Sequence, residues 1–511
     1  MLNGLDRRRF LTATATATLP AFTDLSFLAP LSRLVAADTT IAPKTIERNA
    51  DIIRLVRLIR ETPREKCVSV FVAQLRDGLS YQQFLAGLFL ASLEHGDPHQ
   101  VAQVYSAHRT SSEVRMEERL LPLFWVLDRI ALGFEQEPGR TVKQLSDLKL
   151  TESDLENAVR RAIKQRDPAQ AERTVVMLGR SRGPRTALNV LWEFCSRRAS
   201  GTLGHDPIML ANTWRTLDAL GWQHAEPVLQ YLAAAFARNE SDASFEPNRE
   251  FVESTLPKLP GNWSIGKADR GATLDFYGIL RDGNWNDACK LICSSLISGK
   301  LNARATWDAV HLVAADLLVR YKTGGSPIGG VLVHAVTATD ALRFGFDCTG
   351  NNDARLLMLL QAVAMLDEVF ITPAKRDGEL RDMNLLDLGE TASESVKSIA
   401  EVFELLPHKD FLLVQKSADE RSASDRACTG AFSLLQQPAT AKQYMQVARG
   451  LMCTKASLDP HDFKYPAAAF DDAFAASPEW VPYLLASSVH ALHGPQSSDS
   501  AVLLQAREAF G

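Results

Sequence analysis

The sequence predicts an all-α protein, a large array of antiparallel helix pairs around a buried central pocket. Three observations support this class. Apolar residues recur at helical spacing, as in Ile52, Val56 and Ile59, helix start signals are frequent, and runs that alternate like strands are scarce. The length of 511 residues, with 46% hydrophobic and 23% charged residues, is typical of a globular chain with one large or several average domains.

The first 37 residues are typical of a twin-arginine export signal. Arg7, Arg8 and Arg9 precede Phe10-Leu11, a mildly apolar stretch follows, and Val35-Ala36-Ala37 offers small residues for cleavage. We therefore expect the twin-arginine export machinery as a partner and a periplasmic or secreted location. The alternative interpretation is a disordered N-terminal arm. Residues 38–511 are predicted to form one all-α domain, and a secondary boundary near 136–150 is left open.

Start signals place the helices along this domain. Ser80–Gln83 and Thr391–Glu394 resemble capping boxes, and Asp97-Pro98, Asp206-Pro207 and Ser326-Pro327 each place proline at a first helical position.

Other segments interrupt or imitate this helical pattern. The short alternating runs 67–73 and 411–415 are flanked by helical patterns and are interpreted as helical. Longer loops are expected at 135–149, 239–270 and 372–391.

Composition and missing motifs exclude several function classes. Lys plus Arg total 56 against 61 Asp plus Glu, so the chain lacks the basic footprint of a nucleic-acid binder. After the signal no apolar run reaches the ~18 residues of a membrane span. The seven cysteines are dispersed and are interpreted as small buried residues. No Rossmann, P-loop, zincin or serine-hydrolase motif is present.

Three histidines are the strongest candidates for chemistry. His334 lies in the most apolar helix, three residues before Thr337, and a buried imidazole must satisfy both nitrogens or serve a function. His311 follows Asp308 by three residues, so that carboxylate would orient its ring. His205 stands at a helix N-terminus, where the macrodipole keeps the ring neutral.

We predict that these three histidines act as catalytic bases or ligands. They would line one pocket, with Thr337, Trp214 and Trp307 contacting a substrate, and the metal is unknown. The alternative for each histidine is a structural hydrogen bond. His95, His99 and His224 are interpreted as structural.

The same segments resemble the questin oxidase-like family. Gly204-His205-Asp206-Pro207-Ile208-Met209-Leu210 is similar to its G-H-P-x-I-H-L segment, with Met209 in place of the second histidine. Residues 331–337 are similar to its F-x-M-H-x-[VL]-T segment, and 84–98 to its first apolar helix and following turn, with Phe84 where that helix would carry a histidine. The resemblance implies an all-α fold and oxidative cleavage of an aromatic polyketide with NADPH and oxygen. His205 and His334 match its motif positions.

The sequence thus favours an exported oxidoreductase that acts on a small apolar or aromatic compound. The alternative is a non-catalytic helical scaffold or binding protein of the periplasm. The cofactor is unknown, because only the resemblance implies NADPH.

Replacing Arg7 and Arg8 together with lysine should retain precursor inside the cell, because a twin-arginine receptor recognises the arginine pair and not the charge alone. Cell fractionation followed by immunoblotting measures the precursor and the exported form. Unchanged export of the double variant would contradict the prediction.

Overall fold

The computed structural model describes residues 50–140, 145, 154–238, 246–322, 332–390, 396–409 and 417–510. Helix follows helix in these residues, and the sole β-contact among them is an isolated antiparallel bridge between Tyr321 and Leu380. The predicted all-α class is therefore confirmed. The signal-like segment 1–37 lies outside the described residues, so its role stays a prediction.

The first half of the described chain is a succession of helices. They are α2 (Ala50–Glu61), α3 (Arg64–Arg76), α4 (Tyr81–His95), α5 (Pro98–Ser111), α6 (Leu121–Gln136), α7 (Leu155–Lys164), α8 (Pro168–Arg182), α9 (Pro184–Arg197), α10 (His205–Leu220) and α11 (Ala225–Arg238).

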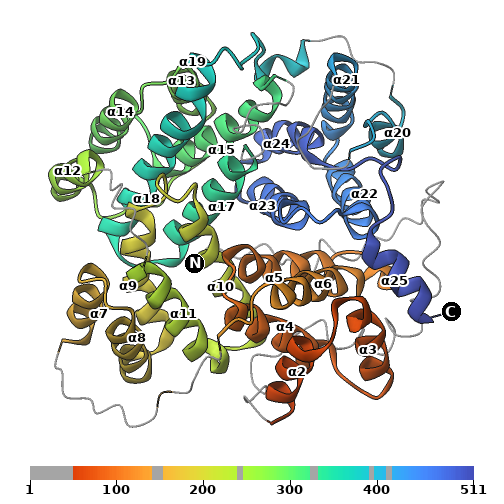
Figure 1. Cartoon of the computed structure of the whole chain (residues 1–511). Helices are drawn as coiled ribbons and strands as arrows, with labels where there is room; N and C mark the ends of the chain where they lie inside the picture. The colour runs from red at the N-terminus through yellow and green to blue at the C-terminus, as the bar shows by residue number, and fades with distance from the viewer. Residues whose placement is uncertain are drawn as a thin grey trace.

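The second half continues in the same way around the other side of the molecule (Figure 1). Its helices are α12 (Glu246–Thr255), α13 (Arg270–Asp282), α14 (Trp285–Ser298), α15 (Ala303–Arg320), α17 (Val333–Cys348), α18 (Asn352–Met365), α19 (Thr372–Arg376), α20 (Ile399–Glu404), α21 (Ala418–Leu435), α22 (Pro438–Lys455), α23 (His461–Ala475), α24 (Val481–Ser488) and α25 (Ala501–Phe510). A π-helical turn, Leu366–Ile371, links α18 to α19.

Two of the five predicted start signals are confirmed, one is wrong and two lie outside the described residues. Ser80 forms the predicted capping box with Gln83, and Asp97 caps α5 with Pro98 at its first position. The prediction at Asp206-Pro207 was wrong, because α10 begins at His205 and has Gly204 as its N-cap. The signals at 326–327 and 391–394 lie outside the described residues.

Two of the expected loops contain helices. The loop expected at 239–270 includes α12, which packs against α14 and α18 and buries Val252. The loop expected at 372–391 begins with α19. Tertiary packing stabilises these short helices, which are too short to be stable alone. The alternating run 67–73 lies within α3, as interpreted, while the run 411–415 lies outside the described residues.

One hydrophobic cluster extends from Ile52 to Ala506 and joins the helices into a core. All seven cysteines are free, and six of them are buried, as expected of small apolar residues. One stretch, 352–376, is apolar and long enough to cross a membrane. Other parts of the fold bury 78% of its most apolar window.

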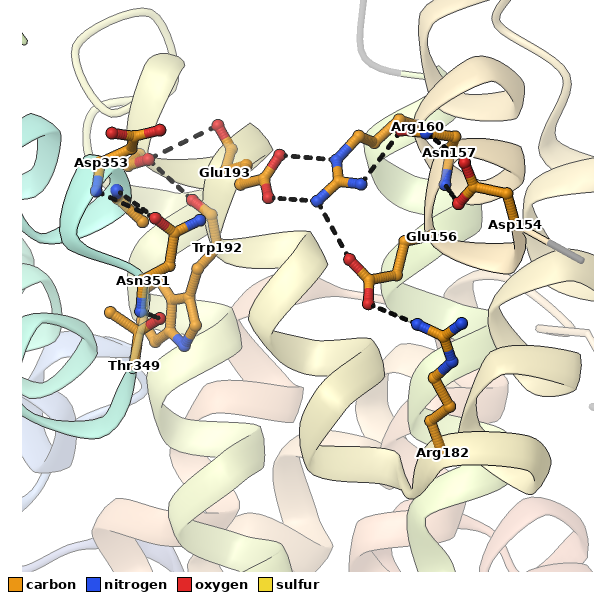
Figure 2. Close-up of polar contacts among 12 residues, drawn as sticks. Asp154, Glu156, Asn157, Arg160, Arg182, Trp192, Glu193, Thr349, Asn351 and Asp353 are labelled. Atoms are coloured by element: carbon orange, nitrogen blue, oxygen red, sulfur yellow. Dashed lines mark hydrogen bonds and ion pairs between the residues drawn. The ribbon is translucent and has the colours of Figure 1, made fainter.

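Ion pairs fasten the outer helices α7, α8 and α9 to one another. Figure 2 shows Arg160 of α7 donating to both carboxylate oxygens of Glu193 in α9, at 2.9 and 2.7 Å, while Arg182 of α8 reaches Glu156 at 3.0 Å. These pairs are partly exposed, so each contributes at most about 1 kcal/mol. These ion pairs lie at the edge of the helix array, away from its centre.

Four helices form the centre of the molecule (Figure 1). Helix α10 packs against α5 and α17, and α23 packs against the same two helices from the other side. These four helices therefore form a closed ring of neighbours, although they come from distant parts of the sequence.

Gly204 allows two of these helices to approach closely. It precedes α10 in the left-handed conformation, with φ of 77°, and a Cβ atom there would lie 2.2 Å from the Cβ of Ala338 in α17. Glycine is required at this position for two reasons: its backbone adopts a left-handed conformation, and there is no room for a side chain. The contact holds the start of α10 against α17.

Gly204→Ala should lower the free energy of unfolding by about 2–4 kcal/mol, since it adds backbone strain to overpacking. The matched control is Gly299→Ala. Gly299 has φ of 72°, and a Cβ atom there would meet no atom within 4 Å, so strain alone should cost about 1–2 kcal/mol. Urea unfolding followed by circular dichroism measures both variants. Equal losses would show that the contact with Ala338 does not matter.

Candidate metal centre

Four histidines lie together where the four central helices begin. His205 and His461 are the first residues of α10 and α23, and His99 and His334 are the second residues of α5 and α17. A helix starts at each of them, so all four helix N-termini meet at one point. The helices then extend away from the histidines into the core.

Consecutive imidazoles, in the order His99, His205, His334 and His461, face each other through their Nε2 atoms. The Nε2 of His205 lies 3.0 Å from that of His99 and 3.1 Å from that of His334. The Nε2 of His461 lies 3.3 Å from that of His334. For His99, His205 and His334, one ligand atom from each residue lies within 4.8 Å of the others. The site is therefore a compact set of nitrogen donors.

The opposite ring nitrogens fix the tautomers of two of these histidines. The Nδ1 of His205 lies 2.7 Å from the carbonyl oxygen of Thr202, which can only accept, so this Nδ1 carries the proton. The Nδ1 of His461 lies 2.7 Å from a carboxylate oxygen of Asp459. Neutral rings with protonated Nδ1 atoms direct Nε2 lone pairs into the cluster.

His99 has a similar partner. Its Nδ1 lies 3.5 Å from Asp97, whose carboxylate also accepts the backbone N–H of His99. Carboxylates and carbonyls in this position orient metal-ligating histidines in many proteins.

Burial disfavours the charged form of two of the rings, those of His205 and His461. It lowers the pKa of His205 to about 4, and the nearby Lys464 lowers it further. Burial also lowers the pKa of His461, against the opposing effect of Asp459. Nε2 lone pairs that face each other repel unless a cation lies between them. Neutral rings are also available to a metal without competition from protons near neutral pH.

The distances suit a metal ion. Nitrogens bound to a tetrahedral ion at ~2.0–2.1 Å would lie about 3.3 Å apart. The three consecutive Nε2 separations are 3.0, 3.1 and 3.3 Å, and His99, His205 and His334 form the group at metal-ligand spacing, with His461 next to His334. Asp97 and Asp459, whose pKa values are lowered mainly by hydrogen bonds from His99 and His461 against the effect of burial, would balance the charge of a divalent cation. Imidazole donors suit zinc, copper, iron and nickel.

Lys464 closes one side of the cluster. Its Nζ lies 3.4 Å from the Nε2 of His334, and burial lowers its pKa to about 7. One helical turn beyond the histidines, Lys464 and Thr337 line a cavity of about 10 Å³ together with Tyr105, Asn212 and Arg215. The Oγ1 of Thr337 has no partner in the described residues. This cavity accommodates about one water molecule.

The structure brings His205 and His334 together, but His311 lies elsewhere. The Nδ1 of His311 is 3.3 Å from Asp472, and its ring lies beside that of Trp307. The expectation that Asp308 orients this ring was wrong, because the carboxylate of Asp308 accepts hydrogen bonds from Ser477. Among the described residues, no contact joins His311 to the four-histidine cluster.

The predicted substrate-binding residues are also dispersed. Thr337 lines the cavity next to the cluster, but Trp214 packs against Trp222 with a ring separation of 5.5 Å. Trp307 packs against His311 and Phe346. Their roles in binding a substrate stay predictions.

Sequence reasoning missed two members of the cluster. His99 was interpreted as structural, and His461 was not singled out. A signal for both was present, because Asp97-Pro98-His99 and Asp459-Pro460-His461 repeat the same tripeptide. In both copies the aspartate accepts the histidine N–H at 2.9 Å and lies next to its Nδ1.

Comparisons with protein-family models, curated proteins and solved structures gave no match to this chain.

His311→Leu should make the fold less sensitive to acid. Burial lowers the folded-state pKa of His311 to about 4, below the ~6.5 of an unfolded histidine. The unfolded chain therefore binds more protons, and the stability contributed by the neutral ring is lost as pH falls from about 6.5 towards 4. Between pH 7 and 5 the variant should lose about 2 kcal/mol less than the parent chain.

Urea unfolding at the two pH values measures this difference, and His408→Leu, at an exposed histidine, is the control. An unchanged pH dependence in His311→Leu would refute the prediction.

Proposed function

We propose that the chain is a metal-dependent oxidoreductase that acts on a small apolar or aromatic compound at the four-histidine cluster. The observation that supports this proposal is the convergence of His99, His205 and His334 at metal-ligand spacing, with the Nε2 of His461 3.3 Å from that of His334. Asp459, Asp97 and the carbonyl of Thr202 lie next to the opposite nitrogens of three of these rings. Such an arrangement is difficult to explain as packing, because His205 and His461, which carry their proton on Nδ1, direct only acceptor lone pairs towards the other rings.

The residues of the chain have separate parts in this proposal. His99, His205, His334 and His461 would hold a divalent first-row metal ion, and Asp97 and Asp459 would fix the ring orientations of His99 and His461. A metal bound by imidazoles supplies Lewis acidity and, when it is iron or copper, electron transfer. The resemblance to the questin oxidase-like family adds the oxidative reaction, the aromatic substrate class and NADPH, and the export signal adds a periplasmic or secreted location.

A non-catalytic role in helical scaffolding or metal binding is the second candidate. The observation that favours it is the size of the cavity next to Lys464, about 10 Å³, which leaves no room for an aromatic substrate on that side. In this role the cluster would join four helices through a structural metal.

Metal binding should be lost when histidines of the cluster are replaced by alanine. The full chain, stripped with a chelator and reloaded with Fe²⁺ or Zn²⁺ in turn, should take up about one ion by elemental analysis. A His99→Ala/His461→Ala double variant should retain none, and Asp459→Asn should bind about 10–100-fold more weakly. His408→Ala is the matched control and should load fully. A parent chain that takes up no metal would exclude the proposed centre.

Oxygen consumption separates the two candidates. The iron-loaded chain, supplied with NADPH and an aromatic polyketide, should consume oxygen, and the histidine double variant should not. Full metal loading without oxygen consumption would favour the structural role.

A further inference from the structure

A second cavity lies away from the histidine cluster, between the end of α22 and the start of α25. Its volume is about 140 Å³, enough for several water molecules or a small organic molecule. Its walls include Trp125 of α6, Lys409, Lys455, and residues 457–458 and 498–502.

Lys409 is the unusual residue in this wall. Its side chain is almost fully enclosed, with 3% of the residue exposed. Its Nζ donates to the carbonyl oxygens of His490 at 2.9 Å and Leu492 at 3.1 Å. In the described residues no carboxylate lies within ion-pair distance of it, and its third proton has no acceptor. A buried ammonium without a counterion is costly, and an anion in the cavity would remove that cost.

The start of α25 supplies further donors to the same cavity. Ser500 satisfies the backbone N–H of Leu503 with its hydroxyl, at 3.1 Å. The N–H groups of Ala501 and Val502 belong to the first turn, so they have no acceptor within the helix. Both residues line the cavity, and helix N-termini favour negative charge.

The other charges of the wall do not neutralise Lys409. Lys455 pairs with Asp499 at 2.8 Å, which leaves Lys409 as the basic group of the wall without a carboxylate partner in the described residues. Burial lowers the pKa of Lys409 to about 7, and an anion beside it would favour the charged form. Trp125 donates its indole N–H to the carbonyl of Ser457 and presents an apolar surface to the cavity. Within the part of the chain that the structure describes, the wall therefore combines a buried lysine that has no carboxylate partner, the first-turn N–H groups of α25 and an apolar side.

We propose that this cavity binds a small organic anion, whose carboxylate or phosphate group would be held by Lys409 and by the N–H groups of Ala501 and Val502. The apolar remainder of the molecule would lie against Trp125. This site does not depend on the metal proposed for the histidine cluster. Its occupant would nevertheless be close to the segment that orients His461, because the hydroxyl of Ser457 accepts the N–H of Asp459 at 3.0 Å.

Calorimetric titration of the full chain with inorganic phosphate and, separately, with succinate tests the proposal. We expect saturable binding of at least one probe, and the one that binds more tightly identifies the anionic group. Lys409→Met should weaken that binding at least tenfold. Lys164→Met, which changes an exposed lysine of α7, should leave it unchanged.

Ala501→Glu is a second variant that does not disturb the buried lysine. Ala501 is exposed, and a glutamate in the first turn of a helix is favourable for folding, so this variant should fold even if Lys409→Met does not. Its carboxylate would compete with the anion, and binding should again weaken at least tenfold. Two results would overturn the proposal. One is no saturable binding of either probe, and the other is equal affinity in Ala501→Glu and the parent chain, which would indicate an adventitious ion only.

Discussion

The meeting of four helix N-termini is the constraint on which the rest of the structure depends. A helix start exposes backbone N–H groups and carries partial positive charge, so four of them at one point repel each other and need acceptors. The chain provides acceptors through Asp97 and Asp459, which accept the backbone N–H groups of His99 and His461. Gly204 removes the steric barrier at α10. Without these acceptors and this glycine, the first turns of α5, α10, α17 and α23 could not pack so closely together.

The same arrangement determines the chemistry of the histidines. Burial and the nearby Lys464 lower the pKa values of His205 and His461, and positive helix ends act in the same direction, so these two rings are neutral and direct lone pairs inwards. At such a site protonation of the rings is unfavourable, and the Nε2 lone pairs would be available as metal ligands. A metal forms short bonds to several nitrogens at once, and the carboxylates behind the rings balance its charge. The positive helix starts also oppose a cation, so the metal proposed above would depend on Asp97 and Asp459 for charge balance.

The helical class could be predicted from the sequence because it depends on local periodicity. Capping at Ser80 and Asp97 could also be predicted, since a cap involves residues within one turn. His205 and His334 were found because each lies in an apolar helix or at its start. Their convergence with His99 and His461 was not predictable, because contacts across more than a hundred residues depend on how helices pack. The repeated Asp-Pro-His tripeptide was the available signal, and its meaning required two distant copies to be compared.

Exposure indicates from which side a molecule can reach the cluster. His334 is buried, whereas the side chains of His99 and Asp97 are 29% and 30% exposed and that of His461 is 12% exposed. On the opposite side, the cavity next to Lys464 and Thr337 has room for about one water molecule. A substrate of aromatic size would therefore approach along the face of His99, outside the helix starts, while the inner cavity would serve only a small polar molecule. In the proposed function, the first turns of the four helices would supply the metal ligands, so the helical part of the fold would hold the metal.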